Sequence, residues 1–164
     1  MVVISMEYVL VKWIHILSAT LLFGTGLGSA FYKWRIDQSD NLQAIYITNR
    51  NVVAADWIFT TPTVFIQPVT GLWLTHLGNI PVSEPWIFLS LLLFIVSGLC
   101  WLPVVYLQIK MRSIAQHALQ SKQSLPATYH LLARIWFWLG IPAFIAIFTV
   151  YGLMVIKPHF EALA

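Results

Sequence analysis

The sequence predicts an all-α membrane protein, a single domain over residues 1–164 in which four transmembrane helices form a bundle. Of the 164 residues, 59% are hydrophobic and only 9% are charged, whereas about a quarter of the residues in a soluble domain are charged. Four apolar stretches each reach the roughly 20 residues that are needed to cross the hydrocarbon core. The basic residues gather in alternate gaps between these stretches. We therefore expect lipid to be the solvent for most of the chain.

The first two predicted spans cover residues 6–31 and 53–76. The first has no basic region before it and is longer than the apolar region of a signal peptide, so we expect it to remain as a membrane helix. The second contains Pro62 and Pro68. Each proline removes a backbone hydrogen bond and favours a kink in the helix.

The third and fourth predicted spans cover residues 86–108 and 135–156. Residues 110–121 are polar but of helix-forming types, so the third helix is predicted to continue past the membrane. The sequence Ser124-Leu125-Pro126 predicts a break before the last helix. Short and moderate links between four helices favour an up-down bundle.

The distribution of basic residues predicts the orientation of the bundle. The connection 77–85 has no Lys or Arg. By the positive-inside rule, the two basic connections face the cytoplasm and both termini lie outside. The net charge of +3 and the pI of about 9.2 therefore indicate membrane orientation and not nucleic-acid binding. The basic residues of the connections 32–52 and 109–134 are Lys33, Arg35, Arg50, Lys110, Arg112, Lys122 and Arg134.

His15 is the strongest candidate for a functional residue, because an ionisable group inside a membrane helix is costly. It lies about nine residues into the first span, roughly 13 Å along the helix at 1.5 Å per residue. Three interpretations stand: a hydrogen bond to a neighbouring helix, ligation of haem iron, and a proton relay or another metal. Small side chains beside it leave room for a close helix or a flat cofactor. The residues on its face are Ser18, Ala19, Leu22, Gly26 and Ser29.

Polar residues form a stripe along the second span at steps of four, three, four and three. This spacing puts them on one helical face, which should point into the bundle because lipid would leave them unsatisfied. The stripe is either structural glue or the wall of a cofactor or small-molecule cavity. Its first residue is expected to pair with Arg134 or Arg50. The stripe consists of Asp56, Thr60, Thr63, Gln67 and Thr70.

Several other residues are weaker candidates. His76 ends the second span as either a second iron ligand or an interfacial histidine, and Met6 and Met154 are either axial ligands or core residues. His117, His130 and His159 are predicted to be solvated. Gly24 and Gly28 form a small-xxx-small packing motif. Cys100 is the single cysteine, and the sequence has no P-loop, GxSxG or HExxH motif.

Three segments resemble the four-helix HemJ-type protoporphyrinogen oxidases: VKWIHI at 11–16, TPT through GLWL at 61–74, and the proline-to-VIKP stretch at 142–158. The chain also resembles a related bacterial family of predicted integral membrane proteins, domain of unknown function 2269. The resemblance implies a haem b bundle in the bacterial inner membrane with His15 as iron ligand. Where the HemJ-type family carries a functional lysine, this sequence has Ser90.

The leading hypothesis is therefore a small membrane protein that binds haem b through His15 and has a redox or electron-transfer role. Gln67 or Thr63 would fix the tautomer of the imidazole. The alternative is a cofactor-free structural or accessory subunit of a larger membrane complex. A third hypothesis is a small-molecule or metal carrier that uses the polar stripe. The expected partners are the lipid bilayer and a redox partner or larger complex, with a homo-oligomer as a further expectation.

Overall fold

The computed structural model describes residues 5–158, and in this range it confirms the all-α architecture, with no strand. A π-helical turn, η1, joins α2 and α3 into one continuous helix. The bundle therefore has four long helical rods. Its elements are α1 (Met6–Asp37), α2 (Leu42–Ala55), η1 (Asp56–Thr60), α3 (Thr61–Leu77), α4 (Pro85–Ser121) and α5 (Ala127–Ile156).

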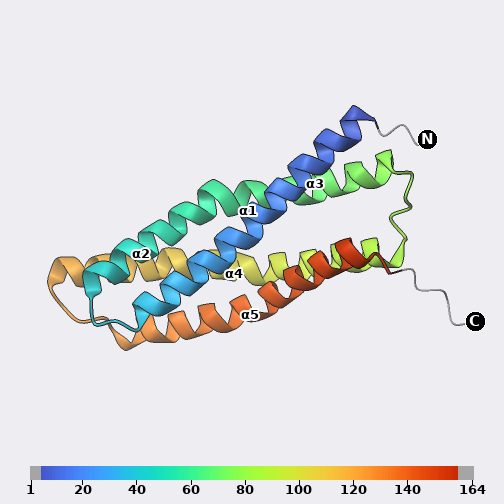
Figure 1. The fold of residues 1–164 in the computed structure, drawn as a ribbon. Coiled ribbons are helices and arrows are strands. Elements are labelled where there is room, and N and C mark those ends of the chain that lie inside the picture. Colours follow the sequence, from blue (N-terminus) through green and yellow to red (C-terminus); the bar gives the residue numbers. More distant parts are fainter. Residues whose placement is uncertain (1–4, 159–164) are drawn as a thin grey trace, which may run out of the picture.

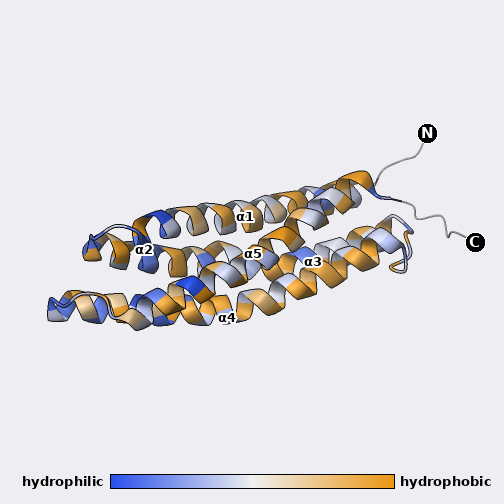
Figure 2. Ribbon diagram, turned by 90° about the horizontal axis from the view of Figure 1, so that it is seen from below, coloured by the Kyte–Doolittle hydropathy of each residue, from blue (hydrophilic) through white to orange (hydrophobic). Residues whose placement is uncertain are grey.

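All four rods are long and apolar enough to cross a membrane. They contain 32, 36, 37 and 30 residues, where roughly 20 suffice. Apolar residues cover the middle of the rods, and the most hydrophilic residues collect toward their ends (Figure 2). Many large apolar side chains point outward, as lipid contact requires; Phe65 and Leu99 are 67% and 65% exposed.

The helices extend further than the predicted spans. The connection predicted over 32–52 is mostly helical, because α1 continues to Asp37 and α2 begins at Leu42, where the Asn41 side chain caps the Ala44 N–H at 3.0 Å. Hydropathy marks where lipid contact ends, whereas a helix can continue into water. The predicted continuation of the third helix and the break at Pro126 are both confirmed, since α4 runs to Ser121 and α5 starts at Ala127.

The rods pack as two pairs that separate toward one end. Helix α4 packs along α5, α1 packs against α3, and α2 connects the pairs through its contact with α4. The pairs lie close together at the end with the α1–α2 and α4–α5 loops, and they diverge toward the end with the α3–α4 loop (Figure 1). We call these the tight end and the open end.

A hydrophobic core fills the tight end. Met111, Ala115 and Tyr129 are completely buried there. Their neighbours come from α2, α4 and α5, so this core holds the two helix pairs together.

A buried polar cluster, which we call the Lys33 cluster, closes the same end. It consists of Lys33, Asp37, Asn49 and Tyr129. The Lys33 ammonium lies 2.5 Å from Asp37 Oδ2 and donates to the Tyr129 hydroxyl at 3.2 Å. Tyr129 donates to Asp37 Oδ1 at 2.6 Å and accepts from Asn49 Nδ2 at 2.7 Å. The prediction that Lys33 lies in a connection is wrong: it lies in α1, is 0% exposed and bonds to Tyr129 of α5, which in turn bonds to Asn49 of α2.

Candidate functional site

A cavity of about 430 Å³ lies at the open end, with walls from all four rods. We call it the His15 cavity. Its volume falls within the range of about 300–1,000 Å³ that is usual for small-molecule sites. Apolar side chains make up most of its wall. The divergence of the two helix pairs therefore creates a space of ligand size inside the bundle.

His15 lies in the wall of this cavity, with its tautomer set by Thr70. The two residues meet at 2.7 Å between Nδ1 and Oγ1. The Thr70 hydroxyl already donates its single hydrogen to the Ile66 carbonyl at 2.6 Å, so it accepts from the imidazole. Nδ1 therefore carries the proton, and Nε2 keeps its lone pair. Within the described residues Nε2 makes no hydrogen bond.

The backbone around His15 is held equally firmly. Gln67 donates to the His15 carbonyl at 2.8 Å and also to the Ser18 hydroxyl. Gly71 faces the ring, since a Cβ there would lie 3.4 Å from His15 Cε1. These contacts fix both the chain and the imidazole before any ligand binds.

Two cations also line the His15 cavity. Lys12 lies one turn before His15, 6.0 Å from the Tyr8 ring centroid, and Lys157 lies 5.7 Å from the Trp86 ring centroid. Lys157 ends α5 in the left-handed conformation with φ of 45°. The described residues that line the cavity include no Asp or Glu. An apolar ligand with acidic groups would therefore find complementary charge here.

Only some of the residues that the sequence assigned to the cofactor site line the His15 cavity. Gln67 and Met154 line the His15 cavity. Thr63 is buried but donates to the Phe59 and Thr60 carbonyls, both at 2.8 Å, and does not line it. His76 is exposed and outside the cavity wall, and Gly26 lines a different cavity.

The predicted polar stripe does point into the bundle. Asp56, Thr60, Thr63 and Thr70 are buried. Thr70, and neither Gln67 nor Thr63, bonds to the imidazole. The sequence feature that could have identified Thr70 is its place in the stripe, one turn after Gln67. The sequence could not tell which hydroxyl lies level with His15, because that depends on the axial offset of two packed helices.

Other predicted side chains are surface residues. His117 and His130 are exposed, as predicted, and His159 lies outside the described residues. The predicted pairing of Asp56 with Arg134 or Arg50 is wrong. Both arginines are exposed, and Asp56 Oδ1 accepts from the Thr60 hydroxyl at 2.9 Å. The Thr60 hydroxyl, one turn away, therefore binds one of the two carboxylate oxygens in place of a cation.

No group of three or more His, Cys, Asp or Glu side chains that could hold a metal ion exists within residues 5–158. Helix α1 contributes one imidazole to the His15 cavity. A metal ion bound there would therefore need most of its ligands from a group other than the protein.

Comparison with known families identifies the family of the chain. A family model described as a predicted integral membrane protein, DUF2269, matches residues 9–158. The match includes all four rods apart from the first turn of α1. Neither the curated proteins nor the solved structures contain a match to the chain.

Proposed function

The chain belongs to the DUF2269 family of predicted integral membrane proteins, and we propose that it binds haem b in the His15 cavity and has a redox or electron-transfer role in the membrane. The observation that carries this proposal is the free Nε2 of His15. Its partner nitrogen is committed to Thr70 at 2.7 Å. A neutral imidazole held in one tautomer by a second residue is the usual form of a histidine metal ligand.

The residues of the cavity fit haem better than a bare metal ion. A porphyrin brings four nitrogen ligands to its iron, so a single histidine is enough to anchor it. Its faces are apolar, like most of the cavity wall, and its propionates would pair with Lys12 and Lys157. Met154 lines the same cavity and is the candidate for a second iron ligand.

Haem would supply one-electron transfer, and the protein would tune it through ligand identity and burial. His15 would hold the iron, and Thr70 would keep the ligating nitrogen unprotonated. Ser90, which stands in place of the HemJ-type lysine, is buried in the cavity wall and donates to the Trp86 carbonyl at 2.6 Å. The proposal therefore does not extend to protoporphyrinogen oxidation.

The location that accompanies this function is the bacterial inner membrane, with both termini outside. The basic residues support this orientation. Lys110 and Arg112 lie in the second half of α4 and Lys122 follows its last residue, so all three lie toward the tight end. The His15 cavity would then lie toward the outer side. A redox partner or a larger complex in the same membrane would exchange the electron.

The test is the visible absorption spectrum of the purified protein, oxidised and dithionite-reduced. Wild type should show a Soret band that sharpens and shifts on reduction. His15→Ala should lose it, while His76→Ala, a matched histidine outside the cavity, should keep it. Circular dichroism should show equal helix content in all three. Full haem retention in His15→Ala would remove this residue as the ligand.

The cofactor-free accessory subunit remains the second candidate, and one observation favours it. Among residues 5–158, a Cβ at Gly24 or Gly28 would meet nothing within 4 Å, so this part of the bundle does not pack against the small-xxx-small face of α1. Such a face suits a helix of another subunit or a second copy. A partner that copurifies from native membranes with a chain free of chromophore would support this candidate over haem binding.

A further inference from the structure

A second cavity, of about 320 Å³, lies between the His15 cavity and the tight end. We call it the Asp56 cavity. Its wall comes from α1, η1, α3, α4 and α5 and is overwhelmingly apolar. Gly26, Gly98 and Gly140 border it, and a Cβ at any of them would meet nothing within 4 Å. The missing side chains therefore leave the space open.

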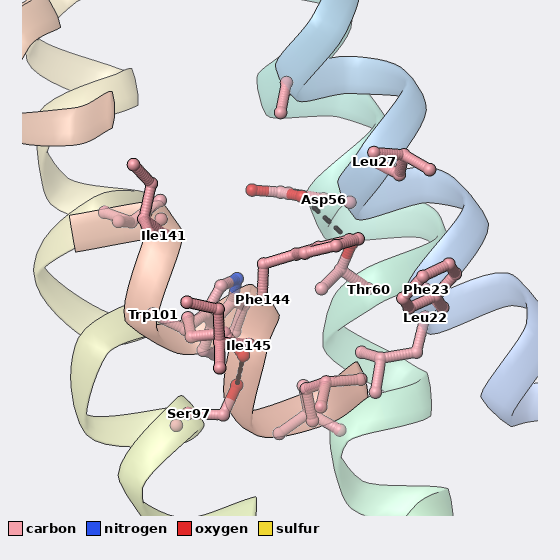
Figure 3. A pocket seen from close by; sticks show the side chains of 18 of the residues that line it. Leu22, Phe23, Leu27, Asp56, Thr60, Ser97, Trp101, Ile141, Phe144 and Ile145 are labelled. Carbon is pink, nitrogen blue, oxygen red and sulfur yellow. Dashed lines mark hydrogen bonds between the residues drawn. The ribbon is translucent and has the colours of Figure 1, made fainter. Parts of the chain in front are cut away.

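Asp56 projects into this cavity from η1, toward α5 (Figure 3). The residue is 5% exposed. Its Oδ1 accepts from Thr60, and the Gln108 side chain interacts with the carboxyl group from α4, but the buried Oδ2 makes no hydrogen bond of normal geometry within the described chain. A carboxyl group at membrane depth with a free oxygen is costly, and such residues generally serve a function.

Three more buried polar atoms of the cavity wall are without a partner among the described residues. One is an acceptor, the Gln108 Oε1, from a side chain that is 4% exposed. The other two are donors, the indole nitrogens of Trp101 and Trp136. All four residues line the same space. More than nine in ten buried polar groups are normally paired, so the concentration of four here points to a ligand that would pair with them.

The backbone at Asp56 supports this interpretation. Residues Asp56–Thr60 form a π-helical turn. Such turns are rare, are less stable than an α-helix and occur frequently at functional sites. The distortion is therefore centred on the segment that carries the carboxyl group.

We propose that the Asp56 cavity binds a lipophilic hydroquinone and its quinone. The mostly apolar wall offers two hydrogen-bond acceptors, from Asp56 and Gln108, and two donors, the indole N–H groups. A phenolic hydroxyl can donate to Asp56 Oδ2 or Gln108 Oε1 while another ring oxygen accepts from an indole N–H. An amphipathic amine would satisfy the carboxylate but would leave both indole donors unpaired. The flat ring and apolar substituents of a hydroquinone match the rest of the wall.

The test measures binding of tetramethylhydroquinone, under nitrogen, to the full chain in lipid nanodiscs, with empty nanodiscs subtracted. Asp56→Leu should weaken binding at least tenfold, because it removes the carboxyl group that would form a hydrogen bond with the ring hydroxyl. Gly98→Leu should abolish binding by filling the space while it leaves every polar group in place. Thr63→Val, buried on the same rod but outside the cavity wall, should bind like wild type.

The inference is independent of the haem proposal, and His15→Ala separates the two. That variant should lose haem and still bind the hydroquinone. Equal binding by wild type, Asp56→Leu and Gly98→Leu would overturn the inference, as would no binding by wild type. Preference for dodecylamine over the hydroquinone, with dependence on Asp56, would replace it with a cation site. Trp101→Phe, expected to weaken binding severalfold, provides a second polar variant if Asp56→Leu does not fold.

Discussion

The two ends of the bundle treat their buried polar groups in opposite ways. In the Lys33 cluster at the tight end, Lys33 and the Tyr129 hydroxyl both have partners within 3.2 Å, and the Asn49 Oδ1 is the one buried polar atom of the cluster that lacks a partner among the described residues. At the open end His15 keeps a free nitrogen, and in the Asp56 cavity Asp56, Gln108 and two indoles keep free polar atoms, although one of these indoles, Trp136, also belongs to the core of the tight end. A satisfied polar network stabilises a fold, whereas free polar atoms beside a cavity are available to a ligand. The difference supports our proposal that the tight end is scaffold and that ligands bind in the two cavities.

The largest effect that would sharpen this comparison is expected from Lys33→Met. The change removes the cation from a buried pair and leaves Asp37 without its charge partner, which typically costs about 3–5 kcal/mol. Unfolding in mixed micelles, followed by circular dichroism, measures it. Arg35→Met, an exposed neighbour in the same turn, is the control and should change stability by less than about 0.5 kcal/mol. Equal effects would mean that the Lys33 cluster does not hold the bundle.

Tyr129→Phe should have the next largest effect on stability. It deletes the hydroxyl that links Lys33, Asp37 and Asn49, and the unsatisfied partners should cost about 1–3 kcal/mol. Haem affinity should not change, because Tyr129 does not line the His15 cavity. A loss of haem without a loss of stability would reverse the roles assigned to the two ends.

Much of the fold follows from the sequence, but the Lys33 cluster does not. The four apolar stretches predict the rods, and the steps from Asp56 to Thr70 predict a buried face, since both depend only on local composition and helical period. Lys33 resembles any topology-determining lysine. Its partner Tyr129 lies 96 positions away, and only the packing of α1 against α5 brings the two together.

The sequence also did not show which of the two cavities a residue lines, because this depends on the position of the residue along the helix axis. Gly26 follows His15 by eleven residues, close to three full turns, so the two share a face but lie roughly 16 Å apart along the helix. That distance puts Gly26 in the Asp56 cavity. Helical spacing fixes the direction of a side chain, whereas the divergence of the rods decides which cavity it reaches.

At the open end, Thr70→Val should weaken haem binding by about 10- to 100-fold, because loss of the group that orients a metal-binding histidine typically costs that much. Haem titration of the purified protein measures it, with Thr63→Val as the matched threonine control. Unfolding of the haem-free protein should change little. An unaltered haem affinity would show that Thr70 does not set the tautomer of His15.

The smallest effect is expected from Lys12→Gln. Partly solvated ion pairs contribute little, so haem affinity should fall only about two- to fivefold. The difference between variant and wild type should shrink as salt is added, since screening weakens exposed charges first. A salt-independent loss would assign Lys12 a packing role along Tyr8 in place of an electrostatic one.

The most direct test of the division between scaffold and site is the thermal unfolding of the haem-free protein with and without added haemin. A ligand present at 100 times its Kd stabilises the folded state by about 2.7 kcal/mol. Haemin should therefore raise the Tm of wild type and, from a lower starting value, the Tm of Tyr129→Phe. It should leave the Tm of His15→Ala unchanged. An equal rise in His15→Ala would contradict the account, because haemin would then bind without the imidazole on which the proposed site depends.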